Sequence, residues 1–378
     1  MVAPCLFAVL AFLSAGISLW QWLAGRCFPL HRRTISPGFA PDVTLLKPLK
    51  GCDLETGRCL QSWLNQNYPG RMQVLFGVAS ADDPVGGLVR ALIRAHPHRE
   101  AQLVICPESL GPNAKVSTLA QLAKLAQHEI MVVSDADVLV PADFLANVVA
   151  PLQEKNTGLV TCLHSLANPA NLAMDLEAIA INADFWSMVL QGKTIRPLDF
   201  ALGAVMAVKF DALRKIGGFA ALADYLADDY ELGHRIAAAG FHIELCPLVA
   251  ECWEAPTTWR QVWSHQLRWA RTVRVCMPGG YFFSILGNAT LWPLVWLAVN
   301  PTFESAAFSF LLVMARVVEA LTLQRDLTCR NDHDPAWWLV PIKDLAGVVI
   351  WALAFLGGRV EWRGQHFRVR RGGRLERV

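Results

Sequence analysis

Long apolar runs near both ends of the chain enclose a middle part in which short apolar segments alternate with amphipathic ones. The first run, Val2 to Gly25, holds no charged side chain and is long enough to span a bilayer. Arg26, Arg32 and Arg33 follow it, and basic residues favour the cytoplasmic side of a membrane helix. A cleaved signal peptide is the alternative, but no basic segment precedes the run and no small-residue cleavage site follows it. We therefore expect an uncleaved anchor over residues 1–26 and a chain that continues in the cytoplasm.

The middle part, residues 41–278, alternates runs of strand length with segments of helical spacing. The expected strands are Val43–Leu46, Gln73–Ala79, Gln102–Cys106, a run starting at Met131, and Gly158–Cys162. Strands that alternate with helices in this way predict βαβ units and a mainly parallel sheet. The remainder is less regular, with a helix expected over Leu172–Val189, a strand over Phe200–Val208, a helix opened by Asp228 and Asp229, and an amphipathic helix over Thr258–Val275.

Residues 279–358 are strongly apolar again and precede a basic tail, residues 359–378. The candidate membrane helices are Tyr281–Val299, Phe303–Leu323 and Trp337–Leu356. The arginine-rich tail is expected in the cytoplasm, whereas three full crossings would leave it outside. One stretch should therefore be interfacial or re-entrant. Lys343 and Asp344 make the last stretch the first choice, and Tyr281–Leu291 is the alternative.

Composition agrees with a membrane protein that has a soluble part. Hydrophobic residues make up 54% of the chain and charged residues only 17%, and the mean hydropathy is +0.33, which is too apolar for an ordinary soluble enzyme. A net charge of +2 gives no reason to expect a nucleic-acid partner. The ten cysteines form no C-x-x-C pair, so we interpret them as apolar fillers in a reducing compartment and not as a disulfide framework.

The apolar run that starts at Met131 ends in Asp135 and Asp137. Carboxylates at the carboxyl end of a buried strand lie where α/β sheets bind ligands, and they suit Mg²⁺ or Mn²⁺ carrying a substrate phosphate. A solvated turn is the alternative for such a pair in isolation. Two further acidic pairs, Asp82–Asp83 and Asp228–Asp229, stand near other predicted element ends.

Along the chain, the acidic pairs are followed by a helix rich in arginine and tryptophan, and this order of motifs is typical of a known enzyme family. The chain resembles the GT-A glycosyltransferases, and more narrowly the ceramide glucosyltransferase-like family (family 2/21), from about Val43 to Tyr281 and again in the tail segment Val360–Phe367. Within that family it looks most like the bacterial hopanoid biosynthesis-associated glycosyltransferases. The segments that carry this likeness are Leu45-Leu-Lys-Pro-Leu-Lys-Gly51, Leu226-Ala-Asp-Asp-Tyr-Glu-Leu-Gly233 and His265-Gln-Leu-Arg-Trp-Ala-Arg-Thr272. The resemblance implies a Rossmann-like GT-A catalytic domain flanked by transmembrane or interfacial helices.

The resemblance also implies roles on the donor side. Asp83 would contact the uridine of a UDP-sugar, and Asp135 with Asp137 would hold a divalent cation, Mg²⁺ or Mn²⁺, on the diphosphate. Asp135 is the firmer of the two, because family members sometimes replace the second acid. Lys115 matches a position near the donor and could pair with phosphate; a solvated charge at a helix start is the alternative.

The resemblance also implies that Asp229 is the general base; an inverting transfer needs one carboxylate to take the proton of the attacking hydroxyl. Asp228 would then be a helix cap. His265-Gln-Leu-Arg-Trp269 lines up with the family's (Gln/Arg)-x-x-Arg-Trp signature, although His265 departs from the commoner form. On a helix, His265, Arg268 and Trp269 share a face that could meet the diphosphate and the acceptor. An interfacial helix with tryptophan and arginine at headgroup level is the alternative.

These inferences predict a multi-pass protein of the bacterial inner membrane with a cytoplasmic catalytic domain. It would transfer a sugar from a UDP-sugar to a lipid hydroxyl, with N-acetylglucosamine and a hopanoid polyol as first choice and glucosylation of ceramide as the alternative. A processive polysaccharide synthase is disfavoured because the C-terminal membrane part is small. A non-catalytic membrane protein with a degenerate transferase domain is a further alternative. Its signature would be the loss of one of the three acids Asp83, Asp135 and Asp229, all of which are present.

Overall fold

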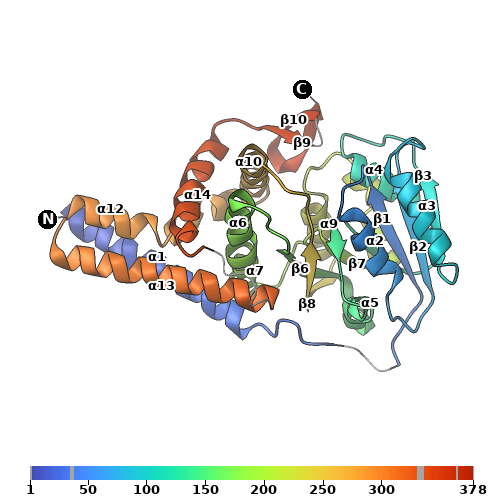
Figure 1. Ribbon diagram of the computed structural model, residues 1–378, viewed down its shortest axis with the longest axis horizontal. Coiled ribbons are helices and arrows are strands. Elements are labelled where there is room, and N and C mark those ends of the chain that lie inside the picture. Colours follow the sequence, from blue (N-terminus) through green and yellow to red (C-terminus); the bar gives the residue numbers. More distant parts are fainter. Residues whose placement is uncertain (1, 35–37, 330–335, 363–364, 378) are drawn as a thin grey trace.

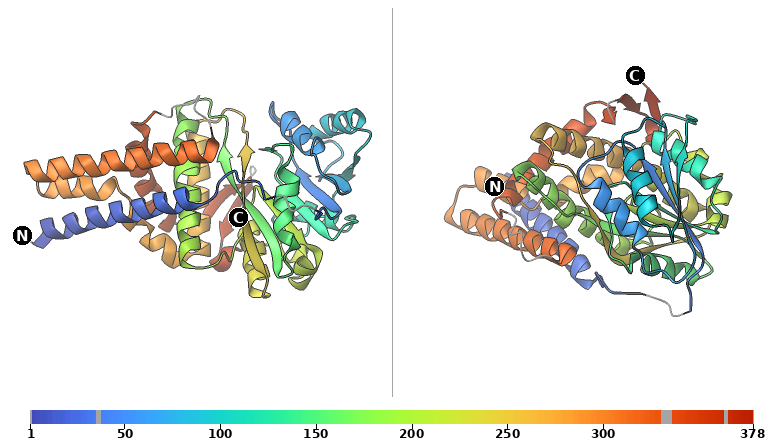
Figure 2. Two further views of the ribbon diagram at one scale, coloured as in Figure 1. Left: turned by 90° about the horizontal axis from the view of Figure 1, so that it is seen from below. Right: turned by 45° about the vertical axis from the view of Figure 1, so that its right-hand side comes forward.

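The computed structural model describes residues 2–34, 38–329, 336–362 and 365–377. Long helices project from one side of an α/β domain (Figure 1), and the two further views show the same separation (Figure 2). Helix α1 (Val2–Cys27) packs along α13 (Phe303–Thr328), and α12 (Leu291–Val299) lies against both. The apolar segments from the two ends of the sequence therefore form one bundle.

The α/β domain is built on an eight-stranded sheet with the order β3-β2-β1-β4-β7-β6-β8-β5. The strands are β1 (Val43–Leu49), β2 (Met72–Val78), β3 (Glu100–Ile105), β4 (Ile130–Ser134), β5 (Val138–Leu139), β6 (Thr157–Leu166), β7 (Val205–Lys209) and β8 (His242–Cys252). The pairs β3–β2, β2–β1, β1–β4 and β6–β8 are parallel, whereas β7 is antiparallel to both neighbours and β5 to β8. The predicted α/β class with a mainly parallel sheet is confirmed.

Helices cover the sheet and bury both of its faces, which explains the continuous apolar runs of its strands. The helices that pack on its strands are α2 (Thr56–Leu64), α3 (Val85–Ala95), α4 (Ala114–Ala123), α5 (Phe144–Val149), α6 (Leu172–Ile179), α8 (Phe210–Lys215) and α9 (Asp228–Ala238), with the 3₁₀ turn η1 (Ala150–Gln153). Helix α7 (Trp186–Ile195) packs mainly on α1, α10 (Trp259–Cys276) on α6 and α14 (Leu339–Phe355), and the 3₁₀ turn η3 (Phe219–Leu222) on α4. Helix α4 approaches β2 so closely that a Cβ on Gly77 would lie 2.6 Å from Thr118 Cγ2. This contact fixes the helix whose first turn carries Lys115.

Two elements differ from the sequence prediction. Strand β1 continues through Lys47 and Pro48, beyond the expected strand Val43–Leu46, and Lys47 is fully buried. The predicted helix Leu172–Val189 is divided by a π-helix, η2 (Ala180–Phe185), between α6 and α7. Hydrophobic periodicity cannot reveal a single wider turn within an otherwise helical segment.

Two of the described helices, α1 from Pro4 to Cys27 and α13, are long and apolar enough to cross a membrane. The segment from α11 (Pro278–Phe283) through η4 (Ser284–Gly287) to α12 is bent by 55° and could form a third, broken crossing. Helix α14 (Leu339–Phe355) holds 17 residues and lies across the direction of α13, beside α6 and α10 (Figure 1). The expectation that one C-terminal stretch does not cross the membrane stays a prediction.

The basic tail, for which no strand was expected, folds into a small antiparallel sheet. Its strands are β9 (Arg359–Trp362), β10 (Gln365–Val369) and β11 (Leu375–Arg377), with η5 (Arg371–Gly373) before the last. The backbone of Leu375 donates to the Asp224 carbonyl (2.7 Å), and the backbone of Leu226 donates to the Gly373 carbonyl (3.1 Å). The tail therefore lies on the α/β domain, directly beside the start of α9.

Candidate functional site

Asp135 and Asp137 follow β4 at the middle of the sheet, where the backbone is held on both sides. The amide of Asp135 donates to the Ala204 carbonyl (3.3 Å), and the amide of Trp253 donates to the Asp137 carbonyl (2.9 Å). Burial, and then the nearby Asp135 charge, raise the pKa of the Asp137 carboxyl to about 6. The two carboxylates are thus fixed and repel each other.

Two buried lysines face this segment. The Lys47 ammonium donates to Ser134 Oγ (3.1 Å) and to the Asp135 carbonyl, and burial lowers the pKa of Lys47 to about 8. Lys115 Nζ lies 2.5 Å from Asp135 Oδ1. Lys115 is only 8% exposed, so the alternative of a solvated charge at a helix start is wrong.

Lys115 connects the acid after β4 with the acid that opens α9. Its Nζ lies 3.8 Å from Asp228 Oδ2, and Asn113 Nδ2 donates to Asp228 Oδ1 (3.2 Å). Burial opposes the charge on Lys115, but Asp135 and Asp228 outweigh it and raise its pKa. Asn113 also caps α4, because its side-chain oxygen accepts from the Val116 amide.

Asp229 has surroundings different from those of Asp228. Its Oδ1 accepts from the Tyr230 amide (2.8 Å), and its Oδ2 lies 2.8 Å from where a Cβ on Gly203 would be. Burial, and then Asp228, raise the pKa of the Asp229 carboxyl to about 6. The expectation that Asp228 is a cap is wrong: the N-cap of α9 is Ala227 without a side-chain capping bond, and Asp228 instead pairs with Lys115.

Asp83 joins the loops that follow β1 and β2. Its two carboxylate oxygens accept from the Gly51 amide (3.1 and 3.2 Å), and Oδ1 also accepts from the Val85 amide (3.0 Å). Gly51 has φ +72°, a conformation that glycine adopts without steric cost. These contacts hold Asp83 at the sheet edge, and its contact with uridine stays a prediction.

Helix α10 places His265 and Trp269 in a cluster of rings. The ring centroids lie 4.6 Å apart for His265 and Trp269, 5.7 Å for Phe185 and Trp269, and 6.3 Å for His164 and Trp269. We call these four side chains the aromatic wall. His265 Nδ1 also lies 2.7 Å from Oε1 of the buried Glu177 of α6, which fixes the imidazole.

Three ionisable residues near the acids were given no role from the sequence. Burial, and then Asp137, raise the pKa of Glu254 to about 7, while Arg268 favours its charged form. Burial lowers the pKa of His164 to about 4, so its imidazole is neutral near pH 7. Lys47 was missed because lysine next to proline is typical of a turn. For Glu254 and His164 the sequence offers no signal beyond their position at strand ends.

The acids after β4 fit a divalent cation that shares its coordination with a substrate. No group of three or more His, Cys, Asp or Glu side chains that could hold a metal occurs in the part of the chain that the structure describes. Mg²⁺ is commonly bound by one or two carboxylates together with substrate phosphates. Asp135 and Asp137 supply two such carboxylates, and their mutual repulsion is what a cation would relieve.

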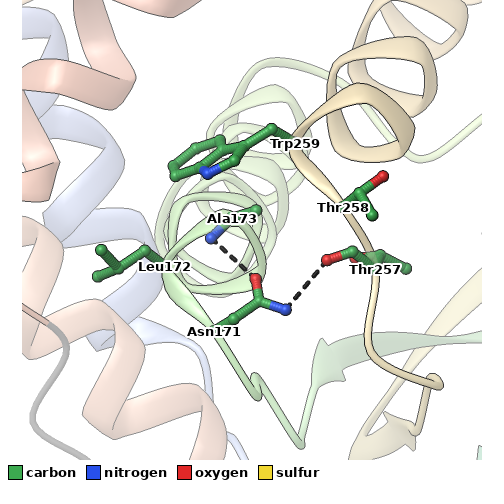
Figure 3. Close-up of a pocket in the computed structure, with 6 residues that line it drawn as sticks. All are labelled: Asn171, Leu172, Ala173, Thr257, Thr258 and Trp259. Carbon is green, nitrogen blue, oxygen red and sulfur yellow. Dashed lines mark hydrogen bonds between the residues drawn. The ribbon is translucent and has the colours of Figure 1, made fainter.

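A mostly apolar cavity of about 450 Å³ opens between the first turns of α6 and α10. Figure 3 shows the residues that line it: Asn171, Leu172, Ala173, Thr257, Thr258 and Trp259. Asn171 Oδ1 accepts from the Ala173 amide (3.0 Å) while its Nδ2 donates to the Thr257 carbonyl (3.0 Å). The loop from Glu254 to Thr257 leads from this cavity towards the acids after β4. Burial raises the pKa of Glu254, and Glu254 lies close enough to Asp137 for the Asp137 charge to raise its pKa further.

The fold and the acids at its strand ends define a GT-A-like α/β domain joined to membrane helices. A mannosyltransferase from Pyrobaculum calidifontis, solved in complex with GDP-Man and Mn²⁺, matches it with a TM-score of 0.59. The two chains are 21% identical, and the match covers 92% of this chain and 97% of the other. At that identity the likeness concerns the fold.

The family model of glycosyl transferase family 21 matches residues 4–375, and the chain belongs to this family. A ceramide glucosyltransferase of Komagataella phaffii is 36% identical over 126 residues, which are 32% of this chain and 25% of the relative. Ceramide glucosyltransferase 3 of Caenorhabditis elegans is 24% identical over 217 residues, 57% of this chain and 46% of the relative. Ceramide glucosyltransferase 1 of the same organism is 22% identical over 240 residues, which are 63% of this chain and 50% of the relative. The chain spans half or less of the length of these relatives.

Proposed function

We propose that this protein is a membrane-bound inverting glycosyltransferase that moves a sugar from a UDP-sugar to the hydroxyl group of a lipid. The observation that carries the proposal is the chain of contacts from Asp135 through Lys115 to Asp228, with Asp229 next to it. These contacts join Asp135, one of the two proposed cation ligands, to the buried ammonium of Lys115 and to Asp228, the neighbour of the candidate base Asp229. Family membership and the presence of Asp83, Asp135 and Asp229 argue against the non-catalytic alternative.

Asp229 is the proposed general base. A base acts best when its pKa lies near the operating pH, and burial has raised the pKa of Asp229 to about 6. Its carboxylate would take the proton of the acceptor hydroxyl while that oxygen forms a bond to the anomeric carbon. The bond from the anomeric carbon to the diphosphate breaks in the same step, so the configuration inverts and no second, nucleophilic carboxylate is needed.

The donor diphosphate is proposed to lie over Asp135, Asp137 and Lys115, with Asp83 on the uridine side. A divalent cation held by Asp135 and Asp137 would supply Lewis-acid neutralisation of the departing diphosphate. Lys115 contributes a buried ammonium that can turn from Asp135 to a phosphate oxygen. Arg268 is the second proposed cation for the diphosphate, approaching from α10.

The acceptor is proposed to approach along the aromatic wall. The π-helix that carries Phe185 contacts β6 of the sheet and α13 of the bundle, and α10, which carries His265 and Trp269, contacts α6 and α14. Rings offer an apolar surface for a lipid and a stacking face for a sugar. Among the described residues, no polar atom bonds the buried Nδ1 of His164, so this nitrogen of the wall carries a hydrogen-bonding position that the protein leaves unused.

The membrane arrangement proposed here places the domain over residues 41–278 and the tail over residues 359–378 on the cytoplasmic side of a bacterial inner membrane. The anchor over residues 1–26 would cross the membrane from the outside to the cytoplasm. Within residues 279–358, the bent segment would cross back to the outside and α13 would return the chain to the cytoplasm. Contacts of β11 with Asp224 support this arrangement, because the tail and the catalytic domain must then share one side. Helix α14 would lie at the interface.

Two lipids compete as acceptor. The motif details Leu45–Gly51 and His265–Thr272 favour a hopanoid polyol with N-acetylglucosamine as the sugar. The names of the curated relatives favour ceramide with glucose. Expression in a host that supplies both lipids, followed by mass spectrometry of the lipid extract, distinguishes the two acceptors. Ceramide that gains the mass of a hexosyl group supports ceramide as the acceptor. A hopanoid that gains the mass of an N-acetylhexosaminyl group supports the hopanoid polyol. Absence of any new glycolipid would contradict the proposed function.

A further inference from the structure

A buried polar network joins the membrane helices to the helix that carries part of the aromatic wall. Arg316 of α13 is 7% exposed. Its Nη2 lies 2.7 Å from Asp184 Oδ1 and 3.0 Å from Asp344 Oδ1, and its Nε lies 3.0 Å from Asp344 Oδ2. Lys343 pairs with both carboxylates as well. The charges of two carboxylates and two basic side chains therefore cancel. These four residues come from three separate elements: η2, α13 and α14.

Asp184 and Phe185 are neighbours at the end of the π-helix, and their side chains contact different parts of the protein. Asp184 reaches the network, whereas the ring of Phe185 packs on His164 (5.4 Å) and Trp269 (5.7 Å). The same π-helix is tied to the end of β6, because Asn182 accepts from the Leu166 amide (2.9 Å) and donates to its carbonyl (3.0 Å). Such π segments occur frequently at functional sites.

Helix packing alone does not require these charges. Apolar side chains of similar volume hold buried interfaces at least as well as ion pairs do. A guanidinium instead imposes direction, since its planar fork fixes both the distance and the orientation of a carboxylate. An arginine held by Asp344 of α14 therefore sets where Asp184, and with it Phe185, must lie.

We propose that the Arg316 network positions the aromatic wall for the lipid acceptor, an inference that rests on the proposed function. Asp184, Arg316, Lys343 and Asp344 act as positioning residues and touch no substrate. Thr290 reinforces the network, because its hydroxyl donates to Asp344 Oδ2 (2.7 Å). The membrane helices thus contribute to acceptor recognition in addition to anchoring the chain.

The test compares three variants of the full chain in lipid nanodiscs. Asp184→Asn removes one charge of the network, and we expect KM for the lipid acceptor to rise about tenfold, with kcat and KM for the donor within about twofold of wild type. Asp184→Glu keeps the charge and should recover most of the acceptor affinity. Asp326→Asn is the matched control: it breaks the Arg26–Asp326 pair (3.0 Å), which also joins two helices of the bundle, and should leave all three constants unchanged.

The outcomes separate this inference from the proposed function. A folded Asp184→Asn protein with wild-type acceptor KM overturns the positioning role, as does an equal loss in Asp326→Asn. If Asp184→Asn fails to fold, Lys343→Gln gives the same readout, because Lys343 also bonds Asp184; an acceptor KM rise there supports the inference and an unchanged KM overturns it. A wild-type protein that glycosylates no lipid contradicts the proposed function itself, and this inference falls with it.

Discussion

The Lys115 ammonium lies 2.5 Å from Asp135 and so joins helix α4 to the acid at the end of the central strand β4. Asp228 lies 3.8 Å from the same ammonium. This buried lysine holds together segments that are far apart in sequence, and a phosphate could displace it from the carboxylates. In the proposed function, its position would let one site bind a diphosphate and keep Asp229 close to it.

Replacing Lys115 tests this relationship. Lys115→Gln leaves Asp135 and Asp228 without their shared cation, and removing one partner of a buried ion pair costs about 3–5 kcal/mol. We expect a lower melting temperature, and weaker UDP binding in isothermal titration. Lys124→Gln, at the C-cap of the same helix, is the control, because the exposed Lys124–Glu108 pair (3.6 Å) should contribute less than about 1 kcal/mol. Equal effects of the two substitutions would contradict the account.

Asp228 and Asp229 are adjacent, yet their substitution should have different kinetic effects. Asp229→Asn removes the proposed base, so kcat should fall about 10²–10⁴-fold while UDP affinity stays within about twofold. Asp228→Asn removes a partner of Lys115, so donor affinity and stability should fall more than kcat at saturating donor. Steady-state kinetics and UDP titration distinguish the two. Full turnover in Asp229→Asn would show that the base lies elsewhere.

Cation binding should depend on pH because of Asp137. Burial and Asp135 raise its pKa from 3.8 to about 6, so the folded protein binds this proton more tightly than the unfolded chain. The stability that Asp137 contributes is therefore complete below about pH 4 and is lost as the pH rises through about 6. Mn²⁺ binds the ionised form and should raise the melting temperature more at about pH 7.5 than at about pH 5. Thermal melts in detergent with and without Mn²⁺ measure this.

Two variants control the cation experiment. Asp137→Asn should remove most of the Mn²⁺-induced shift, whereas Asp211→Asn, an exposed acid paired with Arg214, should keep it. A Mn²⁺ shift that is equal at the two pH values, or that survives in Asp137→Asn, would be evidence against a cation at this site.

His265→Gln restores the commoner residue of the family signature. His265 bonds the buried Glu177 through Nδ1 (2.7 Å), and a glutamine amide can donate to the same carboxylate. We expect this variant to keep kcat/KM within about fivefold of wild type. Glu177→Leu should reduce it much further, because His265 and Gln266 then lose a common acceptor. If His265→Gln were as inactive as Glu177→Leu, the imidazole would have a chemical role beyond its place in the wall.

Much of the fold could be predicted because most strands of the first half contain a short, mainly apolar run between clear turns. Lys47 shows where this reasoning ends: a charged residue before proline indicates a loop, and only its tertiary partners Ser134 and Asp135 make it a strand residue. The tail was missed for a related reason, since its strands are short and rich in arginine and gain stability from packing near Leu226.

For the site, the acids could be found from sequence, but the relations between them could not. Asp228 and Asp229 are equivalent in a helical pattern, and only the fold directs one to Lys115 and the other to Gly203. His164 and Glu254 carry no motif, because their pKa values are set by burial after folding. The link from Asp184 to Arg316 joins residues 132 positions apart and has no local signal at all.

The most direct measurement of the central claim is sugar transfer by the purified full-length protein in nanodiscs, with radiolabelled UDP-glucose or UDP-N-acetylglucosamine, Mn²⁺ and either ceramide or a hopanoid polyol in the bilayer. We predict label in the lipid phase for one donor–acceptor pair, with inverted configuration at the anomeric carbon and with loss of the signal in Asp229→Asn. No labelled lipid with any pair, or label that persists undiminished in Asp229→Asn, would contradict the account.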